Sequence, residues 1–201
     1  MGKRTDAKQK MVQAAKQLIR QRGYNATAFS DVLGLSGTSR GSVYFHFPGG
    51  KTQLAVEAAE AHAFEQVEII DRVARQAESA AQLIEIFIGM GREGMIASEY
   101  GRGCGVAPLI TEGATQDSAE LAETARRAFS EMTDRMAFHF VAFGVERASA
   151  RTLAETVIAG VQGAMITSRA LRSPTPYDSV RAVLAAHAVS VSPKGLKPGR
   201  I

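Results

Sequence analysis

The sequence predicts an all-α protein of about nine helices, with an N-terminal three-helix helix-turn-helix domain followed by a larger helical domain. Three observations support this fold class. Apolar residues recur three and four positions apart along most of the 201 residues, and no stretch shows the alternation that a half-buried strand needs. The third observation is a pair of short helical stretches, near the N-terminus, that are separated by a glycine-containing turn.

Composition and charge narrow the kind of partner. The apolar content of 45% and the charged content of 22% are ordinary for a globular protein that is long enough to form a core. Through Lys51 there are nine Lys or Arg and two Asp, a net charge of +7, whereas the remainder has fifteen basic and eighteen acidic residues, a net charge of −3. The excess positive charge therefore lies in the N-terminal quarter, where it favours binding to a polyanion.

The start of the chain predicts a location. The first ten residues are charged and lack the apolar segment of a signal peptide, and no apolar run approaches the roughly 18 residues of a membrane span. A single cysteine, Cys104, excludes an internal disulfide. We therefore expect a cytoplasmic protein with no membrane partner.

The first helix is predicted over residues 5–22, because its apolar side chains recur at helical spacing. Gly23 follows it, as a glycine often follows the end of a helix. The second helix is predicted over residues 29–35, a turn at residues 36–38, and the third helix over residues 39–47. These segments form the helix-turn-helix.

The third helix has the side chains of a helix that reads DNA. Val43 and Phe47, four residues apart, form its buried side. The other face carries hydrogen-bond donors, on Arg40, Ser42, Tyr44 and His46. Arginine can donate to guanine O6 and N7 in the major groove, and serine or histidine can reach base edges or phosphates. This helix therefore suits the major groove of B-DNA.

The stretch GTSRGSVYFHF, followed by PGGK and by Leu54, resembles the signature of the TetR family of bacterial repressors. Thr38 stands where the family usually has an apolar residue, and Gly50 adds one residue before the lysine. The added glycine resembles the branch that contains the LmrA and YxaF repressors. Beyond about Leu54 the resemblance is one of layout.

The resemblance implies which side chains contact DNA. The polar groups of the third helix would read base edges, and those around it would bind phosphates. Gly41 has no side chain to hold the helix away from the DNA. The expected DNA-binding residues are Thr27, Ser39, Arg40, Gly41, Ser42, Tyr44, His46 and Lys51.

Two of these residues also have a structural interpretation. Thr27 precedes the second helix, so its hydroxyl is suited to capping that helix as well as to a phosphate. Lys51 opens a long helix predicted over residues 51–77, whose exposed amides and ammonium group suit a phosphate. A lysine at the start of a helix is more often only solvated.

The rest of the chain predicts further helices. Ser79 and Gln82 form a capping box before an apolar helix, and residues 100–117 are rich in glycine and expected to be irregular or a short broken helix. Later helices are predicted over residues 117–143, 149–171 and 177–190. With the resemblance, this predicts a helix-turn-helix DNA-binding domain over residues 1–50, an effector-binding and dimerisation domain over residues 51–191, and a disordered tail over residues 192–201.

The resemblance implies a pocket for a small apolar effector in the second domain. Flexible thioethers and aromatic rings suit an adaptable apolar cavity. The expected ligand-binding residues are Phe87, Met90, Cys104, Phe129, Met132, Met136 and Met165. The same side chains also suit an ordinary core, and that interpretation stays open.

A homodimer is the second implication for this domain. In the TetR family the last two helices of each chain form a four-helix bundle across a two-fold axis, and here they would otherwise expose an apolar surface. The expected interface residues are Leu153, Val157, Gly160, Val161, Ala164, Val180, Val183, Leu184 and His187.

The predicted function is a sequence-specific DNA-binding transcriptional regulator, a repressor that a small apolar ligand releases from a palindromic operator. A regulator without a ligand, a redox sensor that uses Cys104, an enzyme with a DNA-binding head and a dimer that binds nucleic acid nonspecifically are the alternatives. The four histidines are scattered and no Cys pair or catalytic motif occurs, so we expect no enzymatic activity, no metal and no cofactor.

Overall fold

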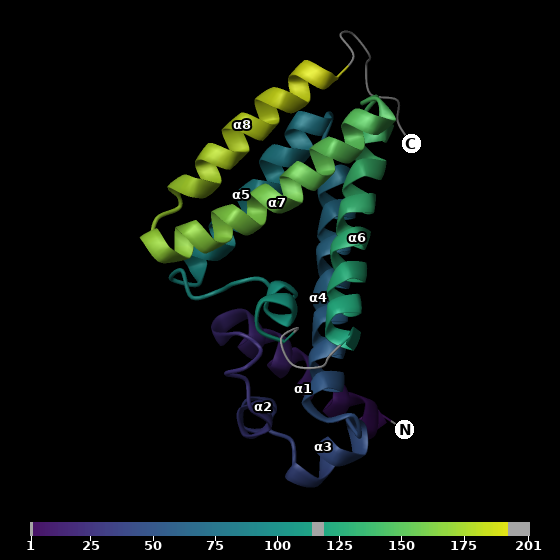
Figure 1. Cartoon of the computed structure of the whole chain (residues 1–201), viewed down its shortest axis with the longest axis vertical. Helices are drawn as coiled ribbons and strands as arrows, with labels where there is room; N and C mark the ends of the chain where they lie inside the picture. Colours follow the sequence, from purple (N-terminus) through teal and green to yellow (C-terminus); the bar gives the residue numbers. More distant parts are fainter. Residues whose placement is uncertain (1, 114–118, 193–201) are drawn as a thin grey trace. The chain divides into compact units, whose positions relative to one another are not determined.

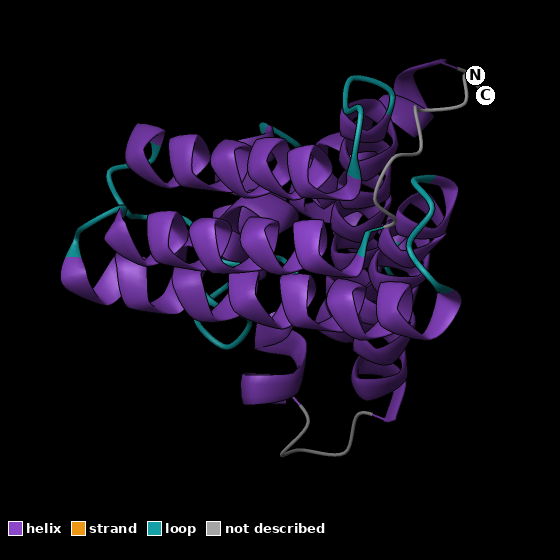
Figure 2. Ribbon diagram, turned by 90° about the horizontal axis from the view of Figure 1, so that it is seen from above, coloured by secondary structure: helices purple, strands orange, loops and turns teal. Residues whose placement is uncertain are grey.

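The computed structural model describes residues 2–113 and 119–192, and all of its regular structure is helical (Figures 1 and 2). Eight α-helices and one short π-helix are found in these residues, and no strand, which confirms the predicted all-α fold. They are α1 (Gly2–Arg22), α2 (Phe29–Ser36), α3 (Arg40–His46), α4 (Gly50–Ala74), α5 (Ala80–Ala97), η1 (Leu109–Gly113), α6 (Ala119–Ala142), α7 (Arg147–Leu171) and α8 (Thr175–Val191).

Local signals set several of the helix ends as predicted. Gly23 follows α1 with a φ of +90°, and its N–H donates to the carbonyl of Ile19 at 2.9 Å. The hydroxyl of Ser79 accepts from the N–H of Gln82 at 3.2 Å at the start of α5. The side chain of Gln82 in turn accepts from the N–H of Glu78 at 2.6 Å. The predicted capping box is therefore formed, one residue wider than its usual pattern.

The predicted cap of α2 is wrong. The N-cap position is occupied by Ala28, and no side chain caps the helix. The hydroxyl of Thr27 points the other way and donates to the carbonyl of Gly23 at 2.7 Å, and its side chain is buried. A hydroxyl one residue before the N-cap position does not reach the first free amides, so Thr27 closes the loop that follows α1 instead.

The irregular stretch predicted over residues 100–117 has an ordered part. It contains η1, whose residues Leu109 and Gly113 are buried. Two non-glycine residues before it, Glu99 and Tyr100, have left-handed backbones with φ of 51° and 61°. The predicted start of the next helix at Asp117, and all but the first residue of the tail predicted over residues 192–201, lie outside the described residues.

The chain divides into two compact units. The first comprises Met1–Glu65 and Gly103–Phe129, and the second Gln66–Arg102 and Ser130–Ile201. Helices α4 and α6 therefore contribute residues to both units. The predicted domain division at residues 50 and 51 concerns which residues bind DNA and which bind an effector, and it stays a prediction.

Each unit has its own core. In the first unit α1 packs on α2, and Met11, Val32 and Phe47 have no exposed surface. In the second unit α5 packs on α8 and α7, and α7 on α8. Glycine permits this close approach, because a Cβ at Gly160 of α7 would lie 2.9 Å from Val180 of α8. Within the described residues, no helix combines the length and apolar character that a membrane crossing needs.

Candidate nucleic-acid interface

The turn between α2 and α3 is fixed by its backbone. Gly37 has a φ of +66°, a left-handed conformation that favours glycine, and its N–H donates to the carbonyl of Leu33 at 3.0 Å. The hydroxyls of Ser36 and Thr38 lie 2.7 Å apart across the turn. The helix-turn-helix that the sequence predicts is therefore formed.

The inner face of α3 anchors the helix to the first unit. Val43 is 2% exposed and Phe47 is fully buried, as predicted from their spacing. The ammonium of Lys8, on α1, lies 5.6 Å from the centre of the Phe47 ring. Burial of two large apolar side chains on one short helix fixes which face it presents outward.

The outer face of α3 is exposed. It carries Arg40, Gly41, Tyr44 and Phe45, and the last two are 74% and 60% exposed. No ion pair or hydrogen bond of the Arg40 guanidinium is found with other described residues, so its donors are open to a ligand. Phe45 is not among the residues that the sequence predicts to bind DNA.

The positive charge of the N-terminal segment is only partly available. Four of its basic side chains form ion pairs inside the first unit: Lys8 with Glu57, Lys10 with Asp6, Lys16 with Glu65 and Arg22 with Asp31. The Lys10 and Arg22 pairs are exposed and therefore weak, so a polyanion can compete for these two cations, whereas the Lys16 side chain is mostly buried. Arg40 needs no such exchange.

The other residues expected on α3 differ in their surroundings. Ser39 is exposed at the N-cap position of α3, and its side chain makes no capping hydrogen bond. His46 is half-buried, and its ring stands edge-on between the rings of Phe45 and Phe47. Ser42 lies in α3, and its side chain is outside the described part of the structure.

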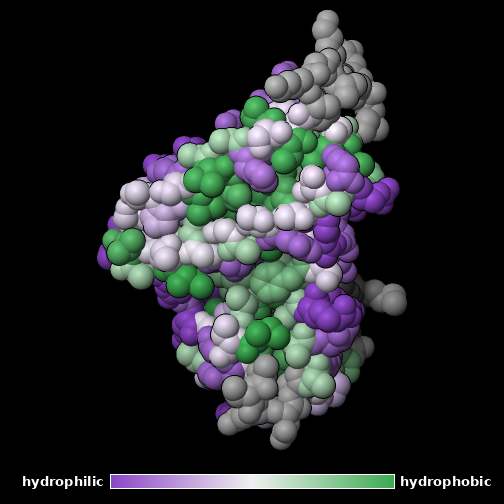
Figure 3. All heavy atoms as spheres, turned by 45° about the horizontal axis from the view of Figure 1, so that its top comes forward, coloured by the Kyte–Doolittle hydropathy of each residue, from purple (hydrophilic) through white to green (hydrophobic). Residues whose placement is uncertain are grey.

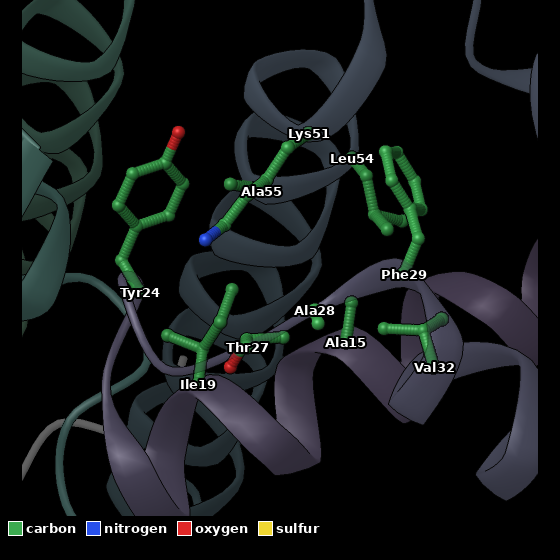
Figure 4. Close-up of a pocket in the computed structure, with 10 residues that line it drawn as sticks. All are labelled: Ala15, Ile19, Tyr24, Thr27, Ala28, Phe29, Val32, Lys51, Leu54 and Ala55. Atoms are coloured by element: carbon green, nitrogen blue, oxygen red, sulfur yellow. The ribbon is translucent and has the colours of Figure 1, made fainter.

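Lys51 points into the first unit rather than outward (Figure 4). Its ammonium donates to the carbonyl of Asn25 at 3.0 Å and lies 4.6 Å from the centre of the Tyr24 ring. Burial lowers the pKa of Lys51, and the negative charge of Glu112 partly offsets this effect. The adjoining pocket in Figure 4 has a volume of about 10 Å³, room for about one water molecule. In this conformation Lys51 holds the loop between α1 and α2 against α4.

The segment before α6 is built into the first unit, which the sequence analysis did not foresee. The N–H of Gly103 donates to the carbonyl of Arg20 at 2.6 Å, and Nε of Arg20 donates back to the carbonyl of Gly103 at 3.1 Å. The carboxylate of Glu112, in η1, accepts from the N–H of Asn25 at 2.8 Å. These partners lie more than 80 residues apart in sequence, so no local signal announces them.

Cys104 is buried, and its sulfur accepts hydrogen bonds from the backbone. It is 7% exposed, and its sulfur accepts from the N–H groups of Val106 at 3.3 Å and of Ala107 at 3.4 Å. Burial restricts the access that a redox-sensing thiol needs. Next to it, a Cβ at Gly105 would lie 2.6 Å from the buried ring of His62.

The other residues expected to bind a ligand lie on three helices. Phe87, Met132 and Met136 are buried, whereas Met90 is 40% exposed. Phe129 and Met165 are half-buried. Among the described residues, no three His, Cys, Asp or Glu side chains group as metal ligands would.

The residues expected at a dimer interface divide by burial. Those already buried within the chain are Leu153, Val157, Ala164 and Leu184, and those at least partly exposed are Gly160, Val161, Val180, Val183 and His187. Other apolar side chains of α7 and α8 are more exposed, with Ile166 at 68% and Val189 at 65%. Figure 3 shows such apolar side chains, in green, among the polar ones on the face of the second unit that carries these helices.

Comparisons with known proteins agree with this arrangement of helices. The family model described as bacterial regulatory proteins of the tetR family matches residues 11–58, and the model described as the C-terminal domain of LmrA/YxaF-like transcriptional regulators matches residues 80–183. The second match alone covers more than half of the chain. The chain belongs to the TetR family. Its matched N-terminal residues include the whole of the helix-turn-helix.

Individual relatives of this TetR-family protein span nearly its full length. An uncharacterised HTH-type transcriptional regulator of Mycobacterium tuberculosis is 37% identical over 86% of this chain and 89% of its own. The HTH-type transcriptional regulator LmrA of Bacillus subtilis is 28% identical over 85% and 90%. The crystal structure of a TetR regulatory protein from Rhodobacter sphaeroides covers 90% of this chain and 98% of its own with a TM-score of 0.80 at 22% identity, which shows the same fold. The protein is therefore a TetR-family transcriptional regulator.

Proposed function

We propose that this regulator is a dimeric repressor that binds a palindromic operator through α3 and leaves it when a small apolar ligand binds. The observation that carries the proposal is the division of α3 into two faces. Val43 and Phe47 are buried, while Arg40 and Tyr44 are exposed and offer donors to a ligand. A helix that is anchored on one side and polar on the other can enter the major groove without unfolding.

Base recognition is assigned to α3. The guanidinium of Arg40 would donate to O6 and N7 of a guanine, and Ser42 and His46 would reach neighbouring base edges. Gly41 lets the helix approach closely because it has no side chain, and in the free protein the space where a Cβ would stand is open. These contacts would set the sequence preference.

Phosphate contacts are assigned to the residues around α3. Ser39 and Tyr44 are exposed and can reach a phosphate in the conformation described. Lys51 and Thr27 would first have to give up the hydrogen bonds to Asn25 and Gly23. We therefore expect Arg40 and Tyr44 to contribute more to affinity than Lys51 and Thr27.

Dimerisation would use the outer faces of α7 and α8. Val183 and His187 are exposed there, together with Ile166 and Val189, and an apolar face of this kind is stabilised by a second copy. Two α3 helices would then meet half-sites about one helical turn, ~34 Å, apart. The interface residues that are buried within the chain would support this face from beneath.

The dimer would release the operator when a ligand favours a different spacing of its two helix-turn-helix domains. The Met and Phe side chains expected to bind it offer apolar, adaptable contacts rather than charges, which favours an uncharged, apolar molecule. Such a ligand lowers DNA affinity only by the difference between its binding free energies to the two states.

The test is selection of DNA from a randomised duplex library, followed by footprinting and by competition with random DNA at several salt concentrations. The proposal predicts a protected palindrome and at least ~10³-fold preference over random DNA. Weak binding that is equal for all sequences and is abolished by salt would contradict it, and would leave only nonspecific electrostatic attachment.

A further inference from the structure

Phe45 is a large apolar side chain on the outer face of the helix that we assign to the major groove. It is 60% exposed, although a phenyl ring gains stability from burial. It follows Gly41 by one helical turn, so the two residues share the exposed side of α3, away from the buried Val43. The ring therefore lies where a base-reading side chain of α3 would lie.

The ring of Phe45 is held in place before any DNA is bound. Its centre lies 4.9 Å from the centre of the His46 ring, with the two planes at 83°. The His46 ring in turn lies 6.4 Å from that of Phe47, which is fully buried. Contacts between exposed and buried rings reduce the freedom that Phe45 would lose on binding.

The neighbouring surface leaves room for a base edge. Gly41, one turn before Phe45, has no side chain, and a Cβ there would have no neighbour within 4 Å. The phenyl ring thus projects beyond the backbone of its own helix on this side. A phenyl ring has no conventional hydrogen-bonding group, so an apolar group is its best partner in the groove.

We propose that Phe45 contacts the 5-methyl group of a thymine, and so specifies an A·T pair at one position of each half-site. Thymine is the base that presents a methyl group in the major groove, and apolar side chains recognise it there. Arg40 and Phe45 would then read two different bases by two different chemistries. This inference rests on the proposed function, because it needs α3 in the major groove.

The test replaces thymine by deoxyuridine, which differs only by lacking the methyl group. A selected operator is synthesised with deoxyuridine at one thymine position at a time, changed in both half-sites together. The wild-type protein should lose about 4-fold in affinity for each contacted methyl, and so about 16-fold at the position that Phe45 reads. Fluorescence anisotropy of labelled duplexes gives these affinities.

Variants separate the contact from other effects of the missing methyl group. The F45A protein should bind the thymine operator more weakly than the wild type does. Deoxyuridine at the sensitive position should then change the affinity of F45A by no more than about 2-fold, which is the deviation expected between sites that do not interact. F45L, which keeps an apolar side chain, should retain part of the sensitivity. F138A removes an equally exposed phenylalanine, 59% exposed on α6, and should behave as wild type.

The outcomes distinguish this inference from the proposed function. A wild-type protein that selects a specific operator but loses the same affinity as F45A at every deoxyuridine position would overturn the inference alone. A protein that selects no sequence would overturn the proposed function, and the inference with it. A change in the unfolding midpoint of F45A is not expected, since its side chain is mostly exposed.

Discussion

The loop between α1 and α2 offers the sharpest test of the packing described. Gly23 has a φ of +90°, and a Cβ placed on it would lie 2.2 Å from Oε1 of Glu112. In G23A, a left-handed backbone at a non-glycine residue costs about 1–2 kcal/mol. Displacement of Glu112 from the N–H of Asn25 adds about 1 kcal/mol, which is at the low end of the cost of losing a hydrogen bond because this bond is exposed. The expected destabilisation is thus about 2–3 kcal/mol.

The double variant isolates the contact. E112A alone should cost about 1 kcal/mol, because it removes the same hydrogen bond. G23A combined with E112A should cost about 2–3 kcal/mol in total, about 1 kcal/mol less than the sum of the two single variants. The apparent melting temperature of G23A should fall by roughly 2–4 °C for each kcal/mol.

Urea unfolding followed by far-ultraviolet circular dichroism measures these differences, with slopes compared to confirm a common transition. G34A is the matched control, since its Cβ would meet nothing within 4 Å in α2. A G23A protein as stable as wild type, or costs that simply add in the double variant, would refute the proposed contact between Glu112 and the loop.

Three further predictions concern helix packing, pH and capping. G91A should destabilise the protein by about 1–3 kcal/mol, because its Cβ would lie 2.9 Å from the buried ring of Tyr177. In G94A, on the same helix, the added Cβ meets nothing within 4 Å, so this variant should stabilise the protein by about 0.5–1 kcal/mol. Equal effects of the two variants in urea unfolding would contradict this prediction. Burial and nearby positive charges lower the pKa of His62 to about 3. Between that pH and about 6.5 the unfolded chain therefore binds a proton that the folded chain does not. The free energy of unfolding should fall as the pH drops below about 6.5, by at most about 1.4 kcal/mol per pH unit. H62F should flatten this fall in unfolding measured between pH ~4 and ~7, and parallel curves would count against a buried neutral imidazole. S79A should lower the free energy of unfolding by about 1 kcal/mol, because it removes the side chain that caps α5, whereas S79D keeps a capping side chain and should not. Melting temperatures compare the two variants, and equal losses of stability would exclude a capping role.

Local sequence signals predict much of the fold. Gly23, Ser79 and the spacing of Val43 and Phe47 each specify a helix end or a buried face through interactions within a few residues. Such signals act the same way in any context, which is why the sequence predicts them. The helix-turn-helix was predictable for this reason.

The parts that the sequence did not predict depend on distant contacts. Glu112 lies in a stretch rich in glycine, and its partner Asn25 is 87 residues away. Lys51 was expected to bind a phosphate, and the sequence does not show that its ammonium lies against the ring of Tyr24 and the carbonyl of Asn25. Both outcomes depend on how the loop after α1 meets other segments, and no periodicity encodes that meeting.

Phe45 and the last two helices show a second limit. Hydrophobic periodicity identifies apolar residues without telling which of them another element covers. Leu153 and Leu184, which were expected at a dimer interface, are buried within the single chain, while Ile166 is exposed. Phe45 looks like a core residue by type and is exposed by position. Only the packed structure separates these cases.

Whether α3 reads the operator is decided by the affinity of R40A for the selected operator and for each of its single-base variants. If α3 reads bases, R40A should lose about 1–3 kcal/mol on the operator and lose discrimination at one base position in each half-site. R75A, which removes an exposed arginine after α4, should bind all duplexes as wild type does. An R40A protein that is weakened equally on every sequence, with only a smaller salt dependence, would show that Arg40 binds phosphate and that α3 does not read the operator through it.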